Sequence, residues 1–122
     1  MELRGWIAAL TGRTELRDAS MPFANLIESG VALCELVNAC RPGSIEKIYR
    51  GGLAYRQMDN VFAFLQACKA EGLAQTDRFE MPDLFERRNL SAVLHTLDLL
   101  RAQYDVLAEG SSSRASAAAP VS

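Results

Sequence analysis

Residues 29–45 combine a helix start, a dense apolar face and an abrupt stop in one short segment. Ser29 can cap the helix, because a serine hydroxyl accepts hydrogen bonds from the free amides of a first turn. The stripe that follows is broad enough for a helix buried on most sides, and comprises Val31, Leu33, Cys34, Leu36, Val37 and Cys40. Pro42 and Gly43 then end the helix. The segment therefore predicts a central helix around which the rest of the chain packs.

Two helical patterns precede this segment. In residues 3–10, apolar side chains recur with the spacing of one helix face, at Leu3, Trp6, Ile7 and Leu10. We expect Trp6 to anchor this helix in the core. Residues 13–20 read as a polar connection, and Pro22 suits the first position of a short helix.

Two long helices are predicted after the central segment, beyond a loop at residues 45–55. Residues 56–71 place apolar side chains on one face, at Met58, Val61, Phe62, Leu65 and Cys68. Gly72 fits a left-handed helix end, and Asn89 can cap the last helix. That helix has the clearest periodicity, with Leu90, Val93, Leu94, Leu97, Leu100, Tyr104 and Leu107. No segment has the two-residue period of a strand, so the pattern predicts an all-helical fold.

Composition allows one domain, because 122 residues with 49% hydrophobic content fill a single core. We assign residues 1–108 to it, and predict that the Ser/Ala-rich residues 109–122 form a disordered tail. The 13 basic and 15 acidic residues give a net charge of −2, which offers nucleic acid or an anionic membrane no broad attraction. No apolar run is long enough for membrane insertion. A cytoplasmic protein is expected.

Catalytic and metal-binding patterns are weak. Cys34, Cys40 and Cys68 match no common zinc spacing, and two of them fall on apolar stripes, so reduced structural thiols are expected. His95 is the single histidine, and no sequence pattern supplies it with catalytic partners. The sequence therefore predicts a non-enzymatic protein without a cofactor or a metal.

Positive charge gathers locally where the central helix ends. From residue 41 to residue 56 the basic residues are Arg41, Lys47, Arg50 and Arg56, against one acid, Glu46. This span carries 4 − 1 = +3 on an otherwise acidic chain. An acidic partner would be attracted here.

Several short blocks, taken in order, resemble the calponin homology (CH) domain, in its single-copy form found in calponin and transgelin. They are Trp6-Ile7, the segment 29–45, residues 58–61, 64–65, 67–69, 83–86 and Asn89-Leu90. The resemblance covers residues 3–101, and implies a compact fold of four main helices plus short connecting helices. Ser29 stands where the family often has Asp. Arg87 and Arg88 stand where calponin-like members often read Gly-Lys, which changes turn flexibility and charge.

The resemblance implies a monomeric cytoskeletal binding module that engages actin filaments or an actin-associated protein. Candidate contacts are Lys47, Arg50, Arg56, Arg87 and Arg88. Strong filament binding in the family generally uses tandem domains, so two alternatives stay open. One is a microtubule-associated or flagellum-associated CH domain, and the other is a signalling adaptor without direct filament binding.

Overall fold

Four main helices and four short helical turns make up residues 2–116, the part of the chain that this computed structural model describes. The main helices are α1 (Glu2–Thr11), α3 (Val31–Cys40), α4 (Ala54–Ala70) and α6 (Leu90–Ser116). The short connecting elements are η1 (Thr14–Arg17), α2 (Phe23–Ile27), η2 (Gln75–Asp77) and α5 (Met81–Phe85). The predicted all-α fold is confirmed, because no strand occurs between residues 2 and 116.

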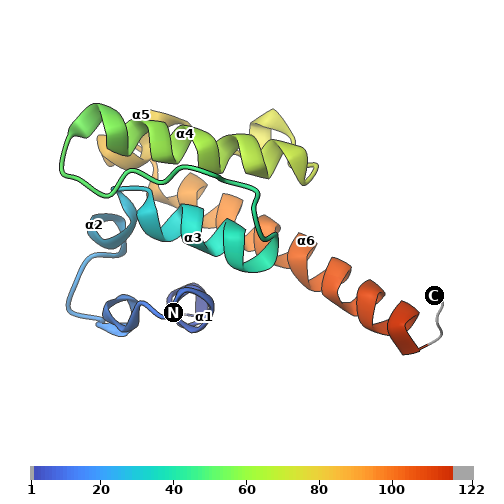
Figure 1. Cartoon of the computed structure of the whole chain (residues 1–122). Coiled ribbons are helices and arrows are strands. Elements are labelled where there is room, and N and C mark those ends of the chain that lie inside the picture. The colour runs from blue at the N-terminus through green and yellow to red at the C-terminus, as the bar shows by residue number, and fades with distance from the viewer. Residues whose placement is uncertain (1, 117–122) are drawn as a thin grey trace.

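Helix α3 lies at the centre, packed against α1 on one side and α4 on the other, with α6 crossing behind it (Figure 1). Five of the six residues of its predicted stripe are buried, with Leu33, Cys34 and Leu36 fully inaccessible to solvent, and Cys40 at its end is half-buried. The C-terminal part of α6 extends beyond the other helices. None of the helices in residues 2–116 is both long and apolar enough to span a membrane.

Two predicted helix ends are confirmed in detail. Gly72 takes a left-handed φ of 97° after α4, and its amide donates to the Lys69 carbonyl at 3.0 Å. The next amide, of buried Leu73, donates to the Cys68 carbonyl, which completes a Schellman motif. At the start of α6, the Asn89 side chain accepts a hydrogen bond from the Ala92 amide at 3.1 Å. These caps fix where the long helices stop and start.

The predicted buried face of α4 is wrong by part of a turn. Met58 and Phe62, both expected in the core, are 44% and 57% exposed. Val61 and Cys68 are fully buried as predicted, and the buried row is completed by Phe64 and by the polar residue Asn60. The first residue of the buried row is the polar Asn60. A prediction that counts only apolar residues leaves it out, and therefore places the buried face toward Met58 and Phe62.

Other expectations need smaller corrections. Residues 13–20 contain η1, which places Leu16 fully in the core. Trp6 is half-buried under Arg101, whose Cζ lies 5.5 Å from the ring centroid, so Leu3 and Ile7 are the core contacts of α1.

Helix α6 continues to Ser116, into the segment predicted as a tail. Residues 117–122 lie outside the described residues, and the domain boundary at residue 108 stays a prediction.

The start of α3 lies directly against α4 at Gly30. The Ser29 hydroxyl accepts a hydrogen bond from the Val31 amide at 3.3 Å, but Gly30, with φ of 78°, is the residue that caps the helix. A Cβ atom on Gly30 would lie 2.5 Å from Cβ of Asn60 and 2.9 Å from the Val61 amide nitrogen. Glycine is therefore needed here for both its backbone conformation and its lack of a side chain.

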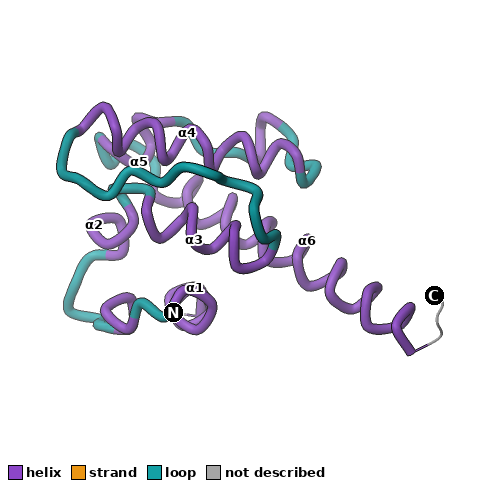
Figure 2. Tube along the Cα trace, viewed as in Figure 1, coloured by secondary structure: helices purple, strands orange, loops and turns teal. Residues whose placement is uncertain are grey.

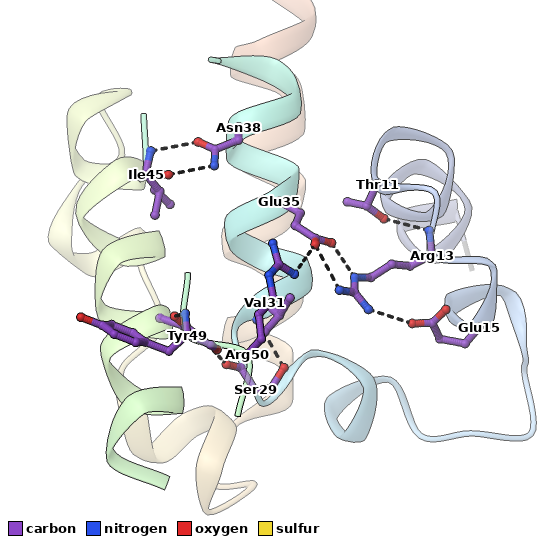
Figure 3. Close-up of polar contacts among 11 residues, drawn as sticks. Thr11, Arg13, Glu15, Ser29, Val31, Glu35, Asn38, Ile45, Tyr49 and Arg50 are labelled. Atoms are coloured by element: carbon purple, nitrogen blue, oxygen red, sulfur yellow. Dashed lines mark hydrogen bonds and ion pairs between the residues drawn. The ribbon is translucent and has the colours of Figure 1, made fainter. Parts of the chain in front are cut away.

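An ion-pair network ties α1 and η1 to α3. Arg13 donates to both carboxylate oxygens of Glu35, and Arg50 donates to one of them at 2.8 Å (Figure 3). The hydrogen bonds from Arg13, and to a smaller extent the one from Arg50, hold the pKa of Glu35 below its ordinary value. Arg13 also pairs with Glu15 at 3.3 Å.

We expect Gly30→Ala to destabilise the fold more than Gly12→Ala. Gly12 has nearly the same φ, 77°, but nothing lies within 4 Å of a Cβ placed there. Gly12→Ala should therefore cost about 1–2 kcal/mol of left-handed strain alone. Gly30→Ala should cost about 1–3 kcal/mol more, because α3 and α4 must move apart. Urea unfolding of the two variants measures the difference, and equal losses would contradict the close approach.

The stabilisation from Glu35 should depend on pH. A carboxylate whose pKa is lowered in the folded state stabilises the fold above its unfolded pKa of about 4.3, and this stabilisation disappears as the pH falls through the folded value. Glu35→Gln should therefore lower the unfolding free energy by about 1 kcal/mol at pH 7, with the gap to the unmodified chain closing below about pH 4.

Glu15→Gln is the matched control for this measurement. Among the described residues the Glu15 carboxylate pairs with Arg13 alone, and it is 53% exposed, so its loss should change stability by only a few tenths of a kcal/mol. A Glu35→Gln effect that stays constant from pH 3 to pH 7 would show that the ion pairs are not its source.

Candidate functional site

Within the basic segment predicted after the central helix, residues 45–50 form an extended strap that runs between α3 and α4 (Figure 2). Two asparagine side chains hold it in place. Asn38 of α3 exchanges two hydrogen bonds with the backbone of Ile45, each of 2.9 Å (Figure 3). Asn60 of α4 accepts from the Tyr49 amide at 2.9 Å and donates to the Tyr49 carbonyl at 2.7 Å. The strap therefore presents its side chains from a fixed backbone.

Two of the five predicted contact residues lie at the Tyr49 ring, and a third, Arg50, is its neighbour in the chain. The guanidinium of Arg56 lies over the Tyr49 ring, with Cζ 4.2 Å from its centroid, and Nζ of Lys47 lies 5.7 Å from the same centroid. Arg50 follows Tyr49 directly, and its side chain is 58% exposed. The face of an aromatic ring attracts cations, which allows like charges to sit close together here. We call Lys47, Tyr49, Arg50 and Arg56 the Tyr49 cluster.

Acidic neighbours neutralise the Tyr49 cluster only in part. Arg50 pairs with Glu35, which it shares with Arg13, and Arg56 lies 3.7 Å from the exposed carboxylate of Asp59. Lys47 has no carboxylate within ion-pair distance among the described residues. In Figure 3 the Tyr49 ring points away from α3 while Arg50 turns back toward Glu35. The exposed positive charge of the cluster therefore comes mainly from Lys47 and Arg56.

Arg87, the fourth predicted contact residue, is bound to another part of the molecule. Its guanidinium donates to the Leu84 carbonyl at 2.7 Å and to the Asn25 side chain at 2.6 Å, and it pairs with Glu28 at 3.1 Å. Its φ of 57° is the only left-handed value at a non-glycine position among the described residues. The glycine that calponin-like sequences often have at this point suits that conformation. These contacts give Arg87 a structural role.

Arg88, the fifth candidate, is exposed beside Arg87. Among the described residues, Arg88 makes one hydrogen bond, from its backbone amide to the Pro82 carbonyl at 3.3 Å. Among the described residues, no hydrogen bond, ion pair or cation–π contact joins Arg87 or Arg88 to the Tyr49 cluster. The sequence-predicted site is therefore divided between two places.

The histidine and the cysteines lie in surroundings typical of structural residues. The exposed ring of His95 contacts a carboxylate oxygen of Asp77 at 3.0 Å. Burial raises the pKa of the thiols of Cys34 and Cys68 to about 12, so both are protonated at neutral pH. All three cysteines are free. Within the described residues, no three His, Cys, Asp or Glu side chains gather as a possible metal site.

The sequence prediction found the cations but missed what positions them. Asn60 is 1% exposed and also donates to the Ser29 carbonyl at 2.9 Å. The sequence feature that could have predicted this role of Asn60 is its position as a lone asparagine within an apolar helix, because a buried amide needs hydrogen-bond partners. Tyr49 carried no such signal, because its role depends on residues 47 and 56 meeting in space.

Comparison with known proteins places these features in one family. Residues 1–105 match the family model described as the calponin homology (CH) domain. Myophilin of Echinococcus granulosus is 38% identical over 93 residues, which cover 75% of this chain and 48% of myophilin. Calponin-2 of Bos taurus is 39% identical over 92 residues, which cover 75% of this chain and 28% of calponin-2. The chain thus spans about half of myophilin and less than a third of calponin-2.

Two further likenesses extend this result. A Rac guanine nucleotide exchange factor B of Dictyostelium discoideum is 33% identical over 78 residues, which cover 64% of this chain and 6% of that protein. The solved calponin-homology domain of an IQGAP protein from Schizosaccharomyces pombe superposes with a TM-score of 0.65 at 29% identity, covering 81% of this chain and 62% of that one. The order of the helices, the capped central helix and the match over residues 1–105 agree: the chain belongs to the calponin homology domain family.

Proposed function

We propose that this CH domain is a non-enzymatic cytoskeletal module that binds actin filaments through the Tyr49 cluster. The observation that carries the proposal is the convergence of Lys47 and Arg56 on one tyrosine ring. This positive feature lies on a chain whose net charge is −2. An acidic segment on a filament would therefore be attracted to this part of the surface, and repelled by much of the rest.

The fixed backbone of the strap supports this proposal. Hydrogen bonds from Asn38 and Asn60 hold both ends of the segment that carries Lys47 and Tyr49. A partner then binds side chains whose backbone is already ordered, which lowers the entropy cost of association. Even so, exposed ion pairs contribute only about 0–1 kcal/mol each, so we expect weak, salt-sensitive binding.

A signalling adaptor is the second candidate. Its support is the similarity to the Rac guanine nucleotide exchange factor B, a protein whose name places it in signalling. In that role the same cluster would bind an acidic regulatory protein, and the chain would not bind filaments directly.

Co-sedimentation with actin filaments, with microtubules in parallel, tests the proposal. We expect the unmodified chain to pellet with actin at low salt and less so at physiological salt. Lys47→Glu combined with Arg56→Glu should reduce the bound fraction severalfold, because it reverses both exposed cations of the cluster. Arg50 is left unchanged, since a reversal there would set like charge against Glu35.

Arg88→Glu is the matched control, an exposed charge reversal outside the cluster. It should leave the bound fraction unchanged. If Arg88→Glu and the double variant reduced the bound fraction equally, the Tyr49 cluster would not be the specific contact site. Pelleting with microtubules alone would replace actin as the partner, and pelleting with neither polymer would favour the adaptor.

A further inference from the structure

Exposed apolar side chains concentrate on one helix. Seven large hydrophobic side chains are exposed in the described part of the chain, and four of them lie between residues 53 and 62. They are Leu53, Tyr55, Met58 and Phe62, with exposed fractions of 59%, 56%, 44% and 57%. We call these four residues the α4 stripe. Scattered exposed hydrophobes are ordinary, but a contiguous group with a polar rim is typical of an interaction surface.

The stripe is a second face of α4 and not a loose edge of the core. Tyr55, Met58 and Phe62 follow the i, i+3, i+7 spacing of one helix face, which runs for about 10 Å at 1.5 Å per residue. Val61, beside the stripe, and Phe64, on the side opposite to Phe62, are fully buried. Helix α4 is therefore apolar on two faces, and among the described residues only one of these faces packs against other helices.

A small hollow lies at the Phe62 end of the stripe. Its volume is about 200 Å³, and it has both apolar and polar walls, lined by Phe62, Leu65, Phe79, Gln66, Gln75, Arg78 and Glu80. Sites that enclose whole small molecules usually measure about 300–1,000 Å³. This hollow is suited to one inserted side chain, which favours a macromolecular partner over a small ligand.

Positive charge lies at both ends of the stripe, and one acidic residue, the exposed Asp59, lies on the same helix face between Tyr55 and Phe62, 3.7 Å from Arg56. Arg56 contacts the Tyr55 ring, with Cζ 5.1 Å from its centroid, and so joins the stripe to the Tyr49 cluster. Lys69 is exposed one heptad beyond Phe62, on the same helix face. It has no carboxylate within ion-pair distance among the described residues. A complementary partner carries apolar side chains in its centre and acidic side chains at its ends.

We propose that the α4 stripe docks an acidic amphipathic helix of a partner protein. A straight row of apolar side chains on one helix matches the i, i+3, i+4, i+7 anchors of another helix laid along it. A second copy of this chain fits less well. Pairing α4 with itself, in either direction, sets Arg56 and Lys69 against cations of the other copy. The proposal goes beyond filament binding and does not depend on it, because the stripe requires only a helical partner.

Three synthetic peptides of about 14 residues, roughly four helical turns, test the proposal. All carry leucine at i, i+3, i+4 and i+7, and the other positions are alanine with glutamate, glutamine or lysine. Fluorescence anisotropy with the full chain should give the tightest binding for the glutamate peptide and the weakest for the lysine peptide. Amide chemical-shift changes should centre on residues 53–65.

Phe62→Ser should weaken binding of the glutamate peptide by about tenfold, the loss expected when one buried aromatic anchor is removed. Leu10→Ser is the matched control, because Leu10 is a 39%-exposed apolar residue on α1. It should leave the affinity unchanged. Both side chains are exposed, so neither variant should unfold, and thermal melts of both verify this.

Several results would overturn the proposal. One is equal affinity for all three peptides, another is equal weakening by both variants, and a third is shift changes confined to other helices. Sedimentation equilibrium of the unbound chain tests the second-copy alternative. A dimer that Phe62→Ser converts to a monomer would assign the stripe to self-association instead of a helical partner.

Discussion

The contact between Gly30 and Asn60 is the point on which the other parts of this CH domain depend. At Gly30 the backbone of α3 approaches α4 so closely that a Cβ atom would lie 2.5 Å from the Asn60 Cβ. The Asn60 side chain then binds the Ser29 carbonyl and both backbone groups of Tyr49. One buried amide therefore joins three segments that are far apart in the chain. These three hydrogen bonds are partly buried, so losing the amide would leave polar backbone groups without their protein partners.

This arrangement connects the core to the surface. The face of α4 that carries Asn60 is buried, and the strap it holds lies between α3 and α4 (Figure 1). Lys47 and Tyr49 are exposed or half-buried on a backbone that the helices fix. A charged loop without such contacts would sample many conformations, and a partner would have to order it on binding. Here the fold has already ordered the strap before any partner arrives.

How far prediction from the sequence succeeded depended on the kind of evidence each residue offered. The central helix was predicted well because Leu33, Leu36 and their neighbours repeat with helical spacing and end at Pro42. The cap residues Gly72 and Asn89 were found because helix ends have strong chemical preferences. Met58 and Phe62 were wrongly predicted to be buried because α4 is apolar on two faces, and helical spacing alone does not tell which of the two packs against the core. Leu16 was missed because one apolar residue in a polar stretch has no period at all.

The sequence alone determined that the chain is helical, where its main helices lie, and that positive charge follows the central one. These properties depend on neighbouring residues, whose spacing and capping chemistry can be read along the chain. Only the tertiary structure decided that Lys47 and Arg56 meet at Tyr49 while Arg87 is tied to Asn25, and which face of α4 is exposed. Those outcomes depend on contacts between residues distant in sequence, such as that of Gly30 with Asn60. No local pattern encodes such distances, because they are set by how closely two helices can approach.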